Sequence, residues 1–186
     1  RPQYLVADPA LRAEWGSRLA RLGRGPKIGI SWRGGSSTEK MLARSVPLNE
    51  WLPVLRVPHA TWVNIQYGPC DGLLRKMADD YGVTIHDWHD LDQTREMESM
   101  AALLSELDLV ISVSNSTVHL AAAVGCPVWL LLSAAADWRW MVERVDSPWH
   151  PSVRLFRQTT QREWADTLGS LGDRLMRLVE RNVAAA

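Results

Sequence analysis

The stretch LVISVSNSTVHLAAAVGCPVWLLL, residues 109–132, decides the fold. Two apolar runs flank the polar turn Ser114-Asn115-Ser116-Thr117, and neither run alternates with polar residues, as is typical of strands covered by helices on both faces. Residues 118–136 are about as long as a membrane span. Gly125-Cys126-Pro127 interrupts them, however, and Gly followed by Pro ends a helix. We therefore predict a short buried helix followed by a buried strand.

Strand and helix patterns alternate along the rest of the chain. Strands are expected at residues 27–32, 61–65, 83–86, 109–113, 128–132 and 153–156, and helices at 9–22, from about 47, and at 71–80, 94–107, 116–124 and 164–178. This alternation predicts an α/β fold with a doubly wound, mainly parallel six-stranded sheet that is Rossmann-like. We expect residues 1–26 to form an N-terminal helix and linker, and residues 27–186 to form one domain.

Composition narrows the classes of function. The 186 residues carry 21 basic and 21 acidic side chains, and this balance argues against a large nucleic-acid or anionic-membrane surface. Cys70 and Cys126 lack the CxxC spacing of a structural zinc site, and no charged-then-apolar signal pattern opens the chain. We expect a reducing, cytoplasmic compartment and no transmembrane segment.

Ligands of such sheets bind outside the carboxyl ends of the strands, so the loops there are the candidate sites. In the turn at residues 114–117, hydroxyl and amide groups can cap the following helix, or they can help its N-terminus to hold a phosphate. Asn115-Ser116-Thr117 is also a glycosylation sequon, which we discount because the turn is expected to be half-buried. Gly34-Gly35-Ser36-Ser37-Thr38, followed by Lys40 and Arg44, is either an anion-binding loop or a plain flexible loop.

Three further features each have two interpretations. His86-Asp87-Trp88-His89-Asp90 could ligate a metal, but its spacing is not a recognised zinc pattern and a solvated turn is favoured. His119 is either a satisfied core histidine or a ligand contact. The Trp-rich residues 137–151 either stack on a base or form a local hydrophobic cluster. No catalytic triad or activated nucleophile is apparent, and we assign no catalytic residue, metal or cofactor.

Several segments together resemble a known family. Residues 107–129, the DWRW segment at 137–140 and SPWHP at 147–151 are similar to the C-terminal domain of glycosyltransferase family 9, the heptosyltransferase-like proteins. Arg44-Ser45-Val46-Pro47-Leu48 and Gln66 fit the same pattern, and the resemblance runs from about Lys27 to about Gln158. Within this family, the chain most resembles the bacterial proteins in which this domain follows tetratricopeptide repeats.

The resemblance implies one half of a GT-B fold, the half that binds a nucleotide-diphosphate sugar. The chain would then be the donor-binding domain of a bacterial transferase that passes a sugar to a hydroxyl acceptor. Carried over by position, the donor-binding residues are Gly35, Ser36, Ser37, Arg44, Gln66, Asn115, Ser116, Thr117, His119 and Asp137. The resemblance places Gly35, Ser36, Ser37 and Arg44 at the diphosphate. It places Ser116, Thr117 and His119 at the diphosphate or sugar, and Gln66 and Asp137 near the nucleotide. The partner of this donor-binding domain would be the N-terminal acceptor domain of the same protein. This chain is expected to lack that domain.

Two departures from the family pattern leave alternatives open. Ser114 stands where family members often have Asp, and the general base of heptosyltransferases comes from the N-terminal half. We therefore expect the isolated chain to be inactive. A degenerate, non-catalytic domain used for protein interaction is the alternative function. A dinucleotide-dependent enzyme is disfavoured because the first strand is not followed by GxGxxG.

Overall fold

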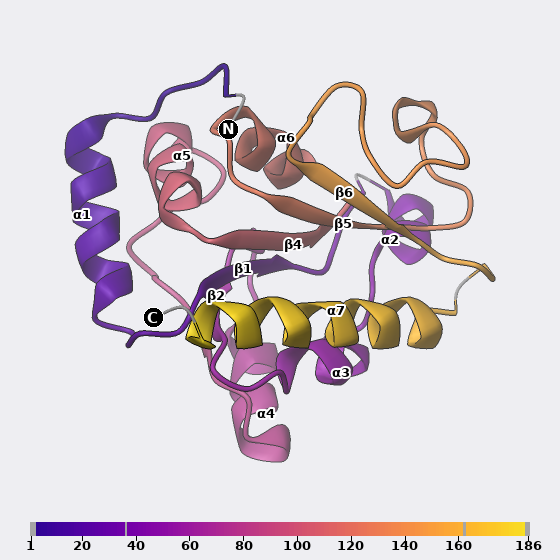
Figure 1. Ribbon diagram of the computed structural model, residues 1–186, viewed down its shortest axis with the longest axis horizontal. Helices are drawn as coiled ribbons and strands as arrows, with labels where there is room; N and C mark the ends of the chain where they lie inside the picture. The colour runs from indigo at the N-terminus through magenta and orange to yellow at the C-terminus, as the bar shows by residue number, and fades with distance from the viewer. Residues whose placement is uncertain (1–2, 36, 162, 185–186) are drawn as a thin grey trace.

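A single parallel sheet forms the centre of the molecule. The computed structural model describes residues 3–35, 37–161 and 163–184. Every neighbouring pair of strands is parallel, and the order is β3-β2-β1-β4-β5-β6 (Figure 1). The strands are β1 (Lys27–Ser31), β2 (Thr61–Asn64), β3 (Ile85–His86), β4 (Leu109–Val113), β5 (Val128–Leu132) and β6 (Val153–Arg157). The predicted doubly wound sheet is confirmed, and its order reverses between β1 and β4, which is where ligands bind in such folds.

Helices cover both faces of the sheet, and the sheet separates two buried hydrophobic cores (Figure 1). One cluster of buried residues joins the sheet to α3, α4 and α7, and the other joins it to α1, α5 and α6. The helices are α1 (Pro9–Ala20), α2 (Thr38–Arg44), α3 (Leu52–Leu55), α4 (Asp71–Tyr81), α5 (Met97–Glu106), α6 (Ser116–Ala123) and α7 (Ala165–Ala184), with 3₁₀-helices η1 (Leu48–Trp51) and η2 (Trp138–Trp140). The apolar strands β4 and β5 are buried along their whole length, as their sequence predicts.

The first helix belongs to one of these two cores. Asp8 caps α1 by accepting hydrogen bonds from the backbone N–H groups of Ala10 and Leu11. Trp15 and Leu19 are buried against α5, and the Trp15 indole donates to Ser99 Oγ at 2.9 Å. The predicted apolar face of this helix therefore packs on the Rossmann-like part of the chain (Figure 1).

The membrane-length stretch folds as the sequence predicts. It forms α6 and β5, and Gly125 joins them with a φ of 80° that favours glycine. No helix among the described residues is long and apolar enough to cross a membrane.

Two elements differ from expectation. Residues 33–45 were expected to be a loop, yet Thr38–Arg44 form α2, because most residues of this segment favour helices. β3 was expected over residues 83–86 but spans only Ile85–His86, where it pairs with β2 at the edge of the sheet.

The Trp-rich segment divides between core and surface. Trp140 is fully buried in η2, whereas the side chains of Trp138 and Trp149 are 77% and 55% exposed. Trp140 therefore belongs to one of the two cores of the sheet and not to a separate local cluster. Trp138 and Trp149 meet edge to face at the surface, and stacking on a base stays a prediction.

Candidate functional site

The site is built where β1 and β4 end side by side. Gln66 follows β2 and is buried beneath this point. Its Oε1 accepts hydrogen bonds from Ser31 Oγ and from the backbone N–H groups of Trp32 and Arg33, at 3.0, 3.0 and 2.7 Å. Its Nε2 donates to the Tyr67 carbonyl at 3.1 Å. The amide of Gln66 thus shapes the turn after β1, and its expected place beside a nucleotide stays a prediction.

Asn115 connects the turn after β4 to the turn after β1. Its Nδ2 donates to Ser31 Oγ at 2.7 Å and to the Arg33 carbonyl at 3.1 Å. Its side chain makes no hydrogen bond to the first turn of α6, although it occupies the N-cap position. The capping interpretation of this turn is therefore wrong for the Asn115 side chain. The amide is needed instead to join two strand ends.

Glycine lets the two turns approach closely. A Cβ atom on Gly34 would lie 2.6 Å from the Ser114 carbonyl oxygen, which is closer than real Cβ contacts. The Gly34 backbone therefore approaches the protein's own chain rather than a ligand. Gly35 follows in the left-handed region with a φ of 109°. Ser36, also expected in this loop, lies outside the described residues.

The N-terminus of α6 opens on a cavity of about 220 Å³. Ser116 and Thr117 line one side, and the first turn of α6 carries no acidic residue. N–H groups of a helix N-terminus that no side chain caps attract anions, helped by the helix dipole. The cavity also has an apolar part, and its full lining is Tyr67, Gln93, Thr94, Met97, Met100, Ser116, Thr117 and Leu120.

A positive charge stands beside one wall of this cavity. The Arg33 guanidinium donates to the carbonyl groups of Tyr67 and Pro69, at 3.4 and 3.2 Å. Arg33 takes part in none of the ion pairs between described residues. Its guanidinium therefore has no carboxylate partner among the described residues.

Arg44 and Asp137 meet on the other side of the β4–α6 turn. Arg44 Nη2 lies 2.8 Å from Asp137 Oδ2, and both side chains are about a quarter exposed. With Ser114 they line a space of only about 10 Å³. Ser114 Oγ itself accepts a hydrogen bond from the Trp140 indole at 3.0 Å. Arg44 would have to exchange its carboxylate partner for a diphosphate before it could bind one.

His119 also lies on this second side. Its ring stacks on Trp140, and its nitrogens contact His150 and Arg139. Burial lowers the pKa of His119, and the nearby charges of His150 and Arg139 lower it further, whereas Asp137 opposes them. The predicted hydrogen-bonding histidine is therefore a neutral group at neutral pH.

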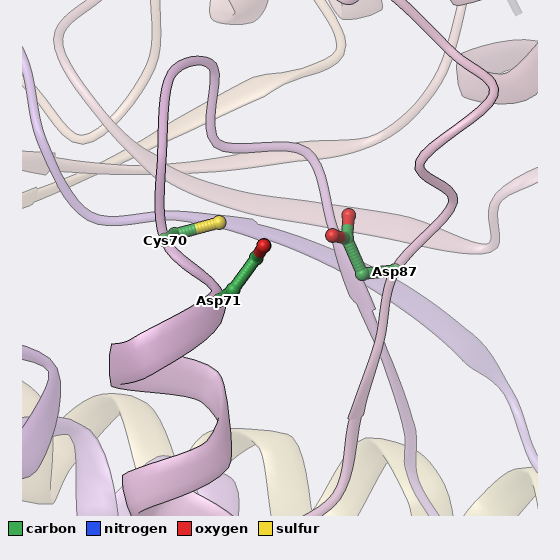
Figure 2. A group of neighbouring side chains, drawn as sticks. All are labelled: Cys70, Asp71 and Asp87. Atoms are coloured by element: carbon green, nitrogen blue, oxygen red, sulfur yellow. The ribbon is translucent and has the colours of Figure 1, made fainter.

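A third group of side chains gathers at the ends of β2 and β3. Figure 2 shows Cys70, Asp71 and Asp87 pointing toward one another, and one donor atom from each lies within 4.8 Å of the others. Asn64 Nδ2 donates to both Cys70 Sγ and Asp87 Oδ1. Burial and the two carboxylates raise the pKa of Cys70, so the thiol stays protonated near neutral pH. These residues could hold a metal only after that proton is lost.

The expected donor-binding residues thus divide into two groups around the start of α6. Ser116 and Thr117 face the 220 Å³ cavity, whereas Arg44 and Asp137 form an ion pair near His119. Gln66 and Asn115 lie between the groups as supports, and Ser37 is exposed at the start of α2. The strand-end rule selected the loops at residues 33–45 and 66–71, which contain Arg33 and Tyr67, without singling these two residues out. Sequence reasoning missed Met97, which lines the cavity from α5.

Comparison with known proteins gives one sequence relative. No family model matches the chain. It is 35% identical over 175 residues to Protein FlbA of Caulobacter vibrioides, an alignment that covers 94% of this chain and 29% of FlbA. The chain therefore spans less than a third of that relative.

Solved structures show the same fold. ADP-heptose LPS heptosyltransferase II of E. coli matches 95% of this chain and 51% of its own, with a TM-score of 0.63 and 13% identity. A glycosyltransferase family 9 protein of Veillonella parvula DSM 2008 matches 83% and 42%, with a TM-score of 0.59 and 12% identity. E. coli heptosyltransferase WaaC, solved with ADP-2-deoxy-2-fluoro heptose, matches 97% and 50%, with a TM-score of 0.54 and 16% identity.

At these identities the likeness is one of fold. The chain has the fold of one half of the GT-B heptosyltransferase structures, and it spans about half the length of each.

Proposed function

We propose that this chain is the donor-binding half of a glycosyltransferase and takes a nucleoside diphosphate sugar at the start of α6. The observation that carries the proposal is the cavity of about 220 Å³ between α6 and α5. Its polar end, at Ser116 and Thr117, suits a phosphate, and its apolar end, at Met97 and Leu120, suits a base. The fold shared with one half of the heptosyltransferases supports the same proposal.

No residue of this chain is proposed as a general base. In this scheme a second domain supplies the base and the acceptor, and the diphosphate leaving group is stabilised by the α6 N-terminus and Arg33. Arg44 joins them once the nucleotide competes with Asp137 for its guanidinium. The isolated chain therefore binds donor without turnover. Association with tetratricopeptide repeats and a cytoplasmic location remain part of the proposal.

A thermal-shift screen against ADP, GDP, UDP, dTDP and their sugar conjugates tests the proposal. Ligand at 100 times its Kd adds about 2.7 kcal/mol, which raises the melting temperature of a domain this size by roughly 5–10 °C. Thr117→Val removes a hydroxyl from the cavity wall and should reduce that shift. Thr84→Val changes an exposed threonine away from the cavity and should leave it unchanged. No shift with any of these ligands would contradict the proposal.

One observation favours a second candidate, a non-catalytic module that has lost its donor. The Arg44–Asp137 ion pair and the buried Ser114 leave a space of only about 10 Å³ on that side of the turn. Arg44→Ala opens this side and separates the two candidates. If the chain binds donor, the variant should bind ADP more weakly than the parent chain. If neither binds ADP, the non-catalytic module is favoured.

A further inference from the structure

Four side chains from separate parts of the sequence form a continuous line of polar contacts beside α6. Tyr4 precedes α1, His119 lies in α6, Arg139 lies in η2 and His150 precedes β6. Tyr4 Oη lies 3.3 Å from His150 Nδ1, and His150 Nε2 lies 3.0 Å from His119 Nδ1. Arg139 Nη1 lies 3.5 Å from His119 Nε2. All four ring nitrogens of the two histidines therefore have a partner.

The Arg139 end decides which way the hydrogen bonds run. A guanidinium only donates, so His119 Nε2 must accept. A neutral imidazole has one donor and one acceptor nitrogen, so His119 Nδ1 carries the hydrogen and donates to His150 Nε2. His150 Nδ1 then carries the hydrogen and donates to Tyr4 Oη. The opposite direction would set an N–H of His119 against an N–H of Arg139.

The surroundings keep this line neutral and in place. Burial lowers the pKa values of both histidines. The charged groups that act on His119 are Arg139, Asp137 and any charge on His150. The His119 ring stacks on the Trp140 indole at 5.4 Å and 16°. The opposite end is held because the Tyr4 backbone N–H donates to the Ala123 carbonyl, at the end of α6, at 3.0 Å.

We propose that Arg139 and His150 are positioning residues that together hold His119 as the neutral Nδ1–H tautomer, because Arg139 donates to Nε2 and His150 accepts from Nδ1. One consequence rests on the proposed function. The diphosphate that draws Arg44 away from Asp137 lies on the His119 side of the β4–α6 turn. Where it attracts Arg139, it leaves His119 Nε2 without its donor, and Nε2 can then take up a proton and donate to the phosphate. Nucleotide binding is therefore coupled to proton uptake by His119, which makes binding stronger as the pH falls.

Nitrogen-15 NMR of the histidine rings tests the tautomer directly, because Nδ1–H and Nε2–H rings give different long-range correlations. We expect His119 and His150 to be Nδ1–H in the unchanged chain. The double variant Arg139→Met, His150→Ala removes both partners and should release His119 toward the Nε2–H form that free imidazoles favour. His150→Ala alone should stay Nδ1–H, because Arg139 still donates to Nε2. Tyr4→Phe changes a 64% exposed side chain and should weaken the Nδ1–H preference of His150.

The control is His89→Ala, which removes an exposed histidine outside the line and should leave both signals unchanged. An Nε2–H or protonated His119 in the unchanged chain at neutral pH would overturn the proposal, and this result needs no variant to fold. A His119 signal that does not respond to a folded Arg139→Met, His150→Ala double variant would also overturn it.

Calorimetry with ADP, in buffers of different ionisation enthalpy, tests the consequence. The unchanged chain should take up a proton on binding, and the His150→Ala variant should take up less. ADP binding without proton uptake would overturn the coupling. Absence of ADP binding would contradict the proposed function, while the NMR result would still decide the tautomer and the role of His150.

Discussion

At the scale of single residues, one buried amide determines how the chain leaves β1. Gln66 Oε1 accepts from Ser31, Trp32 and Arg33, so two backbone N–H groups point inward at the end of the strand. The same turn receives Asn115 from the neighbouring strand end. Gln66 therefore acts on any ligand at this edge through the backbone that it holds.

Replacing Gln66 by Met tests this role. Methionine has nearly the same length but no acceptor, and each buried donor left unpaired costs about 1–3 kcal/mol. We expect Gln66→Met to lower the free energy of unfolding by at least about 2 kcal/mol in urea denaturation. Gln3→Met changes an exposed glutamine and should stay within about 0.5 kcal/mol of the parent chain. Equal stabilities of the two variants would contradict the role given to Gln66.

At the scale of secondary-structure elements, α7 shows how close packing selects glycine within a helix. α7 packs on α3 and the sheet through Leu168, Leu171 and Leu175. A Cβ atom on Gly172 would lie 2.5 Å from the Pro53 carbonyl oxygen in α3, whereas a Cβ atom on Gly169 would meet nothing within 4 Å. There is therefore room for a methyl group at Gly169 but none at Gly172.

Alanine at each position should move stability in opposite directions. Gly169→Ala should stabilise the chain by about 0.5–1 kcal/mol, because alanine loses less backbone entropy on forming a helix. Gly172→Ala should destabilise it by about 1–3 kcal/mol, because α3 and α7 must move apart. Thermal and urea unfolding of the two variants provide the comparison. Stabilisation by both changes would show that α7 does not pack on α3 this closely.

At the scale of the whole molecule, three buried or half-buried histidines link stability to pH: His86 in the edge strand β3, and His119 and His150 beside α6. Burial lowers the pKa values of His86, His119 and His150 in the folded protein below the ordinary value of 6.5. The unfolded chain therefore binds protons at a higher pH than the folded one. Stability contributed by these neutral histidines is present above pH 6.5 and decreases as the pH falls below it.

Urea unfolding between about pH 7.5 and about pH 5.5 should show this decrease, because few carboxylates titrate in that range. The free energy of unfolding should fall with pH, and a variant with His86→Gln, His119→Gln and His150→Gln should show a smaller slope. His59→Gln, at an exposed histidine that takes part in none of the ion pairs between described residues, is the control and should change the slope less than the triple variant does. If the free energy of unfolding of the parent chain does not change with pH, the three histidines are not held neutral as proposed.

Local patterns predicted most of the fold. The apolar runs at β4 and β5, the break at Gly125 and the cap at Asp8 each act over a few residues, and each is found as expected. The strand-end rule also selected the turn at Ser116 and Thr117, which lines the cavity. The helix at Thr38–Arg44 was missed because the glycines and serines before it suggested a loop.

By itself, the sequence determined the parallel sheet, the order of its strands along the chain and the edge at which ligands of such sheets are expected, because hydrophobic period and turn chemistry are local. Only the tertiary structure decided which side chains meet there. In the folded chain, Arg44 forms an ion pair with Asp137, and the Gln66 amide accepts hydrogen bonds from the turn after β1. Tyr4 contacts His150, which in turn contacts His119. Such pairs join residues far apart in the chain, and their geometry depends on how the two halves of the sheet and the helices above it pack together.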